Sequence, residues 1–227
     1  MIRPDAPHLF DRLRVINDRD FRSAAENMAI DETLLEQAVL PTLRFYRWNH
    51  PALSFGYFGR VSEVTQFTGD HDIVRRWTGG GIVFHGHDLT YAMVIPFGTI
   101  SPAPSPRHLY RRVHLALCDA LKDSGRGAEL AVADSLRDSA ACFERPVHSD
   151  VMLANRKIAG AAQRRTRRGL LQQGSIQNVD LAEGFADDFA ARLGRRVEVQ
   201  ALSKDLMARA LEIAESRYAS PAWLGRR

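Results

Sequence analysis

The chain has 227 residues and a formal net charge of +4; 45% of its residues are hydrophobic and 26% charged, which excludes disordered, collagen-like and coiled-coil proteins. No apolar run approaches the roughly 18 residues of a membrane-spanning helix, and the N-terminus lacks the apolar segment of a secretory signal. Two cysteines are too few for a disulfide scaffold, so we expect a soluble protein of the reducing cytoplasm.

The first expected elements are a helix and two strands. Ser23 and Glu26 have the spacing of a capping box, and apolar residues then recur at helical spacing, which predicts a helix over about residues 23–39. The segments LRFYRW and ALSFGYFG are rich in aromatic residues and are separated by His50-Pro51. They are interpreted as two strands around a turn.

Further strands and a second helix follow. The segments DIVRRW and IVFHG flank three glycines, and LTYAMVIPF is a continuous apolar strand suited to the interior of a sheet. Ser105-Pro106 is typical of a helix start and Gly125 of a helix end, which predicts a helix over about residues 106–122.

The remaining pattern decides the expected fold class. The segments SDVMLA and RKIAGAAQRR are joined by Ala154-Asn155, which indicates a hairpin, and GLLQQGSIQ indicates a further strand. The C-terminal quarter is expected to be helical. A block of strands with one inserted helix, placed between helices, favours an α+β domain with a mainly antiparallel or mixed sheet.

The most distinctive motif is RRWTGGGIVFH. The glycines Gly79–Gly81 allow backbone N–H groups to approach a ligand closely, and Arg75 and Arg76 could hold a phosphate or carboxylate. The alternative is a glycine-rich turn between strands with solvated arginines. The motif is neither a Walker loop nor a dinucleotide-binding fingerprint, because the residues that follow do not match.

Two histidines follow the glycines but do not predict a metal site. His85 and His87 alternate on a strand and therefore point to opposite faces, and no Cys/His pair lies at zinc spacing. A structural or substrate-lining role is favoured for His85, and we expect no metal.

A lysine and a cysteine are the candidate reactive residues. Lys157 lies among small residues in an otherwise arginine-rich chain, which favours a function at a cavity over a lysine that reaches solvent at a strand edge. Cys142 precedes the hairpin that carries Lys157, and a thiol near an ammonium group can attack an acyl carbonyl; the alternative is a small buried cysteine. Cys118, within the second helix, is interpreted as structural.

The densest basic cluster is the run of arginines at residues 164–168. No aromatic residues interleave it, so we do not expect nucleic-acid binding. An acidic protein partner or an anionic ligand fits the cluster equally well.

Together these motifs resemble the lipoate–protein ligase and octanoyltransferase family of the biotin/lipoate ligase superfamily. The matching segments are RRWTGGGIVFH with LTY, ENMAIDETLL, LRFYRWNHPALSFGYF and DVMLANRKIAGAAQRRTRRGLLQQGSI, which cover about residues 25–180. The resemblance implies a mixed α+β catalytic domain related to class II synthetase cores. It also implies that residues 1–227 are a single catalytic domain without an accessory C-terminal domain.

The resemblance assigns roles to individual residues. Lys157 of the Lys-Ile-Ala-Gly motif contacts the acyl carbonyl, and the Ala-Cys-Phe motif resembles the octanoyltransferase branch with a cysteine nucleophile, here Cys142. The implied substrate-binding residues are Arg75, Arg76, Thr78, Gly79, Gly80, Gly81, His85, Asp150, Gly160, Ala161, Gln163 and Gly174.

The preferred interpretation is an octanoyltransferase that uses no cofactor and shows no membrane or nucleic-acid binding. Its implied partners are octanoyl-acyl carrier protein and the lipoyl domains of 2-oxoacid dehydrogenases or the glycine cleavage H protein. The alternative is a lipoate–protein ligase that uses ATP and Mg through lipoyl-AMP, with a structural Cys142. Asp150, retained beside Ser149 where ligases carry Asn-Asp, keeps that alternative open, and the Gly-Asn step expected before Leu89 is missing. A non-catalytic acyl-binding protein and a biotin ligase are less favoured.

Overall fold

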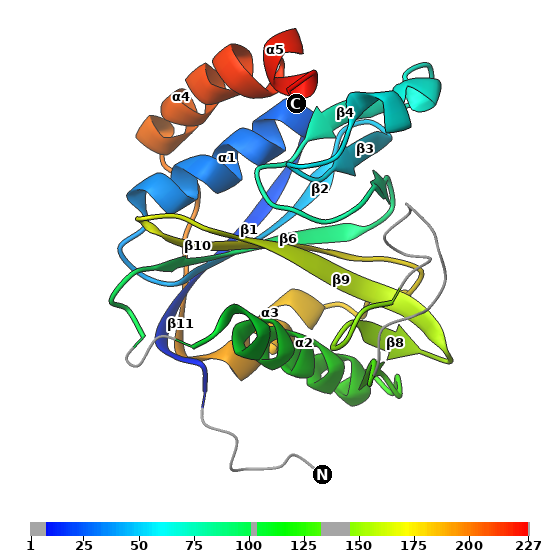
Figure 1. Ribbon diagram of the computed structural model, residues 1–227. Coiled ribbons are helices and arrows are strands. Elements are labelled where there is room, and N and C mark those ends of the chain that lie inside the picture. Colours follow the sequence, from blue (N-terminus) through cyan, green and yellow to red (C-terminus); the bar gives the residue numbers. More distant parts are fainter. Residues whose placement is uncertain (1–7, 101–103, 133–145, 227) are drawn as a thin grey trace.

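The computed structural model describes residues 8–100, 104–132 and 146–226, which form two β-sheets and the helices that cover them (Figure 1). The larger sheet has eight strands in the order β11-β1-β2-β6-β10-β9-β8-β7. The bounds of its strands are β1 Phe10–Arg22, β2 Thr42–Trp48, β6 Leu89–Pro96, β7 Glu129–Leu130, β8 Val151–Leu153, β9 Arg156–Arg165, β10 Gly169–Ile176 and β11 Gly194–Val199.

The large sheet is mixed and mostly antiparallel, which confirms the predicted fold class. Strand β1 runs parallel to both of its neighbours, β11 and β2. Every other neighbouring pair in this sheet is antiparallel.

A small sheet carries the glycine motif. Its strands are β3 Ala52–Phe55, β4 Asp72–Arg75 and β5 Val83–His85, in the order β4-β3-β5. Strand β3 is parallel to β4 and antiparallel to β5. The loop of residues 76–82, which contains the three glycines, therefore joins the two outer strands of this sheet. Two 3₁₀ turns, Val61–Glu63 and Thr65–Phe67, connect β3 to β4.

Helices cover both faces of the large sheet (Figure 1). One face packs against α1 Ala24–Gln37 and α4 Lys204–Ile213, which continues as a π-helix over Ala214–Tyr218 and is followed by α5 Pro221–Leu224. The other face packs against α2 Pro106–Asp123 and α3 Phe185–Leu193. Neighbouring side chains of β6 point to opposite faces of the large sheet: Met93 packs with α2 and α3, and Val94 packs with α1 and α4. This two-sided burial explains why β6 is continuously apolar.

Several local predictions are confirmed. Ser23 and Glu26 form both halves of a capping box at the start of α1. Ser105 caps α2, whose first residue is Pro106. Ala154 and Asn155 join β8 to β9 with φ angles of 48° and 60°, as a tight hairpin turn of two left-handed residues requires.

One expectation needs correction, and the structure adds two features that the sequence did not predict. Strand β1 was not predicted, because its charged and apolar residues do not alternate regularly. The irregularity matches the structure, in which the pairing of β1 with β2 shifts register between Asn17 and Phe21. The C-terminal quarter is not wholly helical, since Gly194–Val199 forms edge strand β11. The segments LRFYRW and ALSFGYFG do form two strands around a turn, as predicted, and the structure places them in different sheets, because β2 pairs with β1 and β6 while β3 pairs with β4 and β5.

No helix in the described ranges combines the length and the apolar character required to span a bilayer.

Candidate active site

An open cavity lies where the small sheet meets the large one, and its empty volume is about 430 Å³ when the solvent at its mouth is included. Helix α1, both sheets and the glycine loop all contribute to its wall. The lining residues are Met28, Tyr46, Trp48, Ser54, Arg76, Gly80, Val83, His85, Thr90, Gly160, Ala161, Ala162, Gln173, Gly174 and Ser175. An apolar wall with a few convergent polar groups is typical of a site for a small organic group.

The glycine loop packs tightly against β3. Gly80 has a φ of 87°, and a Cβ atom built on Gly56 would lie 2.0 Å from the carbonyl oxygen of Gly80. Arg76 braces the loop by donating to the carbonyl oxygens of Gly79 at 3.0 Å and Gly81 at 2.8 Å, and to Ser54 Oγ at 2.7 Å. Arg76 and Gly80 therefore reach the cavity wall, whereas Gly79 and Gly81 contribute the carbonyl oxygens that hold Arg76.

The structure separates the two arginines that the sequence pairs. Arg75 is buried and lies outside the cavity wall. Its guanidinium donates to carbonyl oxygens of the C-terminal segment, including those of Leu224 and Arg226, and to those of Tyr57 and Gly59. The geometry does not fit the predicted anion-binding role for Arg75, because these carbonyl oxygens already use its donors; the residue ties the C-terminus to the small sheet.

Thr78 does not line the cavity but is bonded to a residue that does. Its hydroxyl donates to Gln173 Oε1 at 2.8 Å, and Gln173 Nε2 donates to Asp31 Oδ2 at 2.8 Å. Tyr46 also donates to Asp31 Oδ2, at 3.0 Å. Tyr46 and Gln173, which both line the cavity, thus donate to the same buried carboxylate, that of Asp31 in α1.

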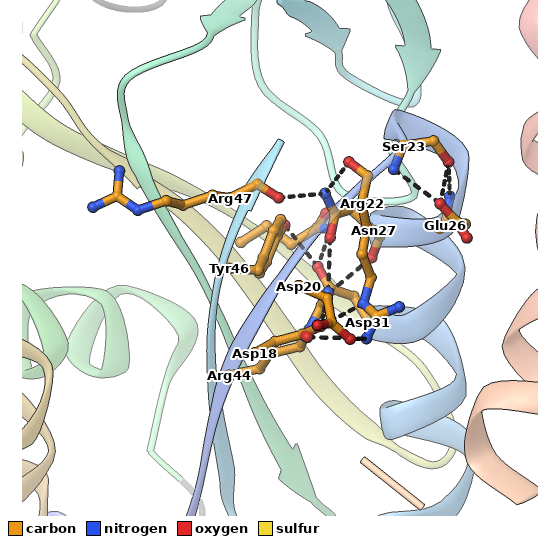
Figure 2. Close-up of polar contacts among 11 residues, drawn as sticks. Asp18, Asp20, Arg22, Ser23, Glu26, Asn27, Asp31, Arg44, Tyr46 and Arg47 are labelled. Atoms are coloured by element: carbon orange, nitrogen blue, oxygen red, sulfur yellow. Dashed lines mark hydrogen bonds and ion pairs between the residues drawn. The ribbon is translucent and has the colours of Figure 1, made fainter. Parts of the chain in front are cut away.

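Asp31 belongs to a buried ion network between α1, β1 and β2 (Figure 2). Arg44 donates to Asp31 Oδ1 at 2.8 Å and to Asp18 Oδ2 at 2.8 Å, and to the Asn27 side chain at 2.7 Å. Burial raises the pKa of Asp31. At Asp18, by contrast, hydrogen bonds and charges from Arg22 and Arg44 outweigh burial and lower the pKa. The network fixes the side of the cavity formed by Tyr46 and Gln173.

His85 lines the cavity, and buried hydrogen bonds also fix its ring. Its Nε2 is 2.7 Å from Ser54 Oγ, its Nδ1 is 2.8 Å from Asp88 Oδ2, and its ring stacks on Trp48 at 4.1 Å. Burial acts to raise the pKa of Asp88, but His85 and other hydrogen-bond donors hold it at about 2. Within residues 8–100, 104–132 and 146–226, no group of three or more His, Cys, Asp or Glu is arranged to hold a metal ion.

Lys157 and Asp150 form a buried ion pair beside the cavity. The Lys157 Nζ atom lies 2.7 Å from Asp150 Oδ2, and both side chains are at most 1% exposed. The lysine crosses Gly160, which belongs to the cavity wall: a Cβ atom there would be 2.6 Å from Lys157 Cε and 2.8 Å from its Nζ. Gly160 thus leaves room for the lysine side chain, but neither Lys157 nor Asp150 is among the residues that line the cavity.

The other predicted residues take different positions. Ala161 and Gly174 line the cavity, and Gly174 faces Tyr91 so closely that a Cβ atom would lie 2.3 Å from that ring. Gln163 lies outside the cavity wall and donates to Gln172 Oε1 and to the Pro106 carbonyl. Cys142 lies outside the described residues, so its predicted role stays a prediction. Cys118 is buried, and burial raises its pKa to about 12, which fits a structural role.

The sequence did not point to several residues in the cavity wall or close to it. Tyr46 and Trp48 follow Arg44 at every second position of β2 and share its face, so strand alternation was the available signal. Gln172 and Gln173 are polar residues inside a fully buried strand, which also marks a special site. For Tyr110, whose hydroxyl bonds Asp150, the sequence holds no such signal.

Comparisons with known proteins identify the family of the chain. The family model for the lipoyl protein ligase A/B catalytic domain matches residues 23–201. The chain is 39% identical over 163 residues to the octanoyltransferase LipM of Carboxydothermus hydrogenoformans, which covers 68% of this chain and 61% of that protein. With the octanoyltransferase LipM of Geobacillus kaustophilus it shares 33% identity over 214 residues, 87% of this chain and 76% of that protein. The match to the first relative thus spans about three fifths of its length.

Solved structures show the same fold. A lipoate-protein ligase A superposes with a TM-score of 0.73 at 19% identity, covering 94% of this chain and 98% of the other. A bi-partite lipoate protein ligase of Thermoplasma acidophilum superposes with a TM-score of 0.70 at 18% identity, covering 96% and 97%. Because the family model also matches most of its length, the chain belongs to the lipoyl protein ligase A/B catalytic-domain family.

Proposed function

We propose that this protein is an octanoyltransferase that moves an octanoyl group from acyl carrier protein to a lysine of a lipoyl domain. The observation that carries the proposal is the buried Lys157 ammonium, which Asp150 holds directly behind Gly160, a residue of the cavity wall. A fixed positive charge at this place can stabilise the oxyanion that develops on an acyl carbonyl. The similarity to octanoyltransferases favours transfer over ATP-dependent ligation.

The proposed reaction has two transfer steps. The Cys142 thiolate attacks the octanoyl thioester, a new C–S bond forms, and the carrier thiolate leaves and takes up a proton. The amine of the target lysine then attacks the Cys142 thioester, the amide bond forms, and the amine loses a proton as Cys142 leaves. The thioester is already activated, so the reaction consumes no nucleotide.

The cavity residues have assigned parts in this proposal. Met28 and Trp48 provide apolar surface for the octanoyl chain, and Arg76 keeps the glycine loop in place above it. Lys157 faces the carbonyl. The partner classes follow: an acyl carrier protein as donor, and lipoyl domains, including the glycine cleavage H protein, as acceptors.

Intact-mass spectrometry tests the proposal directly. Mixed with octanoyl-acyl carrier protein without ATP, the protein should gain one octanoyl group that hydroxylamine removes, and Cys142→Ala should gain none. Lys157→Ala should slow adduct formation by about 100-fold or more, in the range of losing one oxyanion donor. Lys204→Ala, a change at an exposed lysine of α4, is the control and should react normally. If wild-type protein gains no adduct but attaches lipoate to a lipoyl domain only with ATP, the ligase alternative replaces this proposal.

A further inference from the structure

Helix α2 presents two polar side chains, one helical turn apart, to the turn that carries Asp150 and to strand β9, which carries Lys157. The Tyr110 hydroxyl donates to Asp150 Oδ1 and accepts a hydrogen bond from the Ala161 N–H at 3.1 Å. The His114 ring lies 4.2 Å from the Tyr110 ring, with its Nδ1 2.6 Å from the Ser149 carbonyl oxygen. Positions four residues apart share one helix face, so both side chains reach the same turn.

The protonation of His114 follows from its surroundings. Burial lowers its pKa to about 4, so the ring is neutral near pH 7. The Ser149 carbonyl oxygen can only accept, which places the proton on Nδ1. The Nε2 atom then accepts from the Tyr91 hydroxyl at 3.0 Å, and Tyr91 in turn accepts from Gln172 Nε2 at 3.1 Å. His114 is therefore held between the turn before β8 and the centre of the sheet.

The turn that α2 holds has an unfavourable backbone conformation. Ser149 has a φ of 71°, in the left-handed region that non-glycine residues rarely adopt. Such a conformation persists only where its surroundings fix it, and it is common next to functional groups. Here His114 holds the carbonyl of Ser149, and Tyr110 holds the side chain of the next residue, Asp150.

The two oxygens of Asp150 face different groups. Oδ2 is 2.7 Å from Lys157 Nζ and accepts from the Val147 N–H at 2.7 Å, whereas Oδ1 accepts from Tyr110. The Tyr110 bond therefore limits rotation of the carboxylate about its Cβ–Cγ bond, and that rotation would move Lys157 across Gly160. Ala161, which donates to Tyr110, also lines the cavity, so one hydroxyl joins Asp150 to the cavity wall.

From these contacts we infer that Tyr110 and His114 are positioning residues, which act through Asp150 to place the Lys157 ammonium at the acyl carbonyl. The inference rests on the proposed octanoyl transfer for its kinetic consequence. Neither side chain lines the cavity, so neither is needed to bind the octanoyl chain. Loss of either should lower kcat and leave KM for the acyl carrier nearly unchanged.

A double-mutant cycle tests the inference kinetically. Tyr110→Phe should lower kcat by about 10- to 100-fold, the range expected when a reacting group is misplaced by about an ångström. In an Asp150→Asn background the same change should lower kcat less than about twofold, because the residue through which Tyr110 acts is already altered. Equal losses in both backgrounds, or a raised KM with unchanged kcat, would overturn it.

Two further variants separate positioning from stability. Tyr218→Phe removes another buried tyrosine–carboxylate bond, 2.8 Å to Glu32 and away from the cavity, and should lower Tm with kcat unchanged. His114→Asn retains an N–H donor near the Ser149 carbonyl and should recover part of the kcat that His114→Leu loses. If the two His114 variants lose kcat equally, the hydrogen bond to Ser149 has no positioning role.

A labelling experiment tests the positioning without any octanoyl transfer. The chain has three lysines, so an amine-specific acetylating reagent and peptide mass spectrometry can follow each one. Tyr110→Phe should label Lys157 several-fold faster than wild type, while the exposed Lys122 and Lys204 react at unchanged rates. If wild type transfers no octanoyl group, this rate still decides the inference: unchanged labelling of Lys157 refutes it. If wild type is active and labelling is unchanged, the positioning inference alone fails.

Discussion

The residues next to the cavity show how the buried ammonium group of Lys157 is held in one position. Lys157 lies almost out of reach of solvent, where an unpaired ammonium would be very unfavourable, and Asp150 compensates its charge. Glycine at position 160 leaves the space that the lysine side chain occupies. The position of Lys157 therefore depends on the absence of a side chain at Gly160 as much as on the charge of Asp150.

Substitution of Gly160 tests this dependence on space. In Gly160→Ala the new Cβ would overlap Lys157 Cε, so we expect the flexible lysine to shift, with at least a tenfold lower rate of octanoyl transfer and little change in Tm. Gly69→Ala is the matched control, because a Cβ atom there meets nothing within 4 Å. Transfer rates and thermal unfolding of both variants check the expectation. Normal transfer by Gly160→Ala would show that Lys157 needs no fixed position.

Strand β2 shows how one element serves two purposes. Leu43 and Phe45 face α2 and α3, whereas Arg44 and Tyr46 face α1. The α1 side therefore contains a fully buried arginine with two carboxylates around it (Figure 2). Replacing one member of such a group leaves the remaining charges uncompensated, which is far more unfavourable than losing the whole group.

An Arg44→Met substitution measures this network. We expect it to lower the free energy of unfolding by about 3–5 kcal/mol, because Asp31 then lies buried without its cation. Arg12→Met removes a solvent-exposed pair with Glu198 between β1 and β11 and should lower the free energy of unfolding much less. Urea unfolding of both variants compares the two pairs. Equal effects would mean that the buried network contributes no more than a surface pair.

Across the whole molecule, burial of titratable groups couples stability to pH. The folded pKa of His114 is about 4, below its ordinary value of 6.5. As pH falls from 6.5 towards 4, the unfolded chain therefore binds a proton that the folded chain does not. The stability of the fold is unaffected by this group above pH 6.5 and declines below it.

The His114→Asn variant isolates this effect. Wild-type protein should lose up to about 3 kcal/mol of unfolding free energy through this group between pH 6.5 and pH 4. The variant has no titrating ring and should show a correspondingly shallower decline. Urea unfolding at several pH values measures both slopes, and parallel slopes would rule out His114 as the source of acid sensitivity.

Local sequence patterns determined much of this molecule. The capping box of α1, the two-sided β6, the hairpin turn at Ala154-Asn155 and the glycine loop all follow from residues close together in the chain. Such features arise from backbone preferences and periodic burial, which nearby residues control. Gly160, close to Lys157 in the chain, leaves space for the lysine side chain, whereas the predicted contact of Lys157 with an acyl carbonyl stays a prediction.

Tertiary structure alone decided the contacts between distant segments. Arg75 and Arg76 are adjacent in sequence, yet one binds carbonyl oxygens near residue 224 and the other braces the glycine loop. Tyr110 and Asp150 meet only because α2 packs beside β8 and β9, and β11 forms because β1 offers it a parallel partner. These contacts depend on which surfaces meet when the sheet is covered, and local periodicity contains no information about that choice.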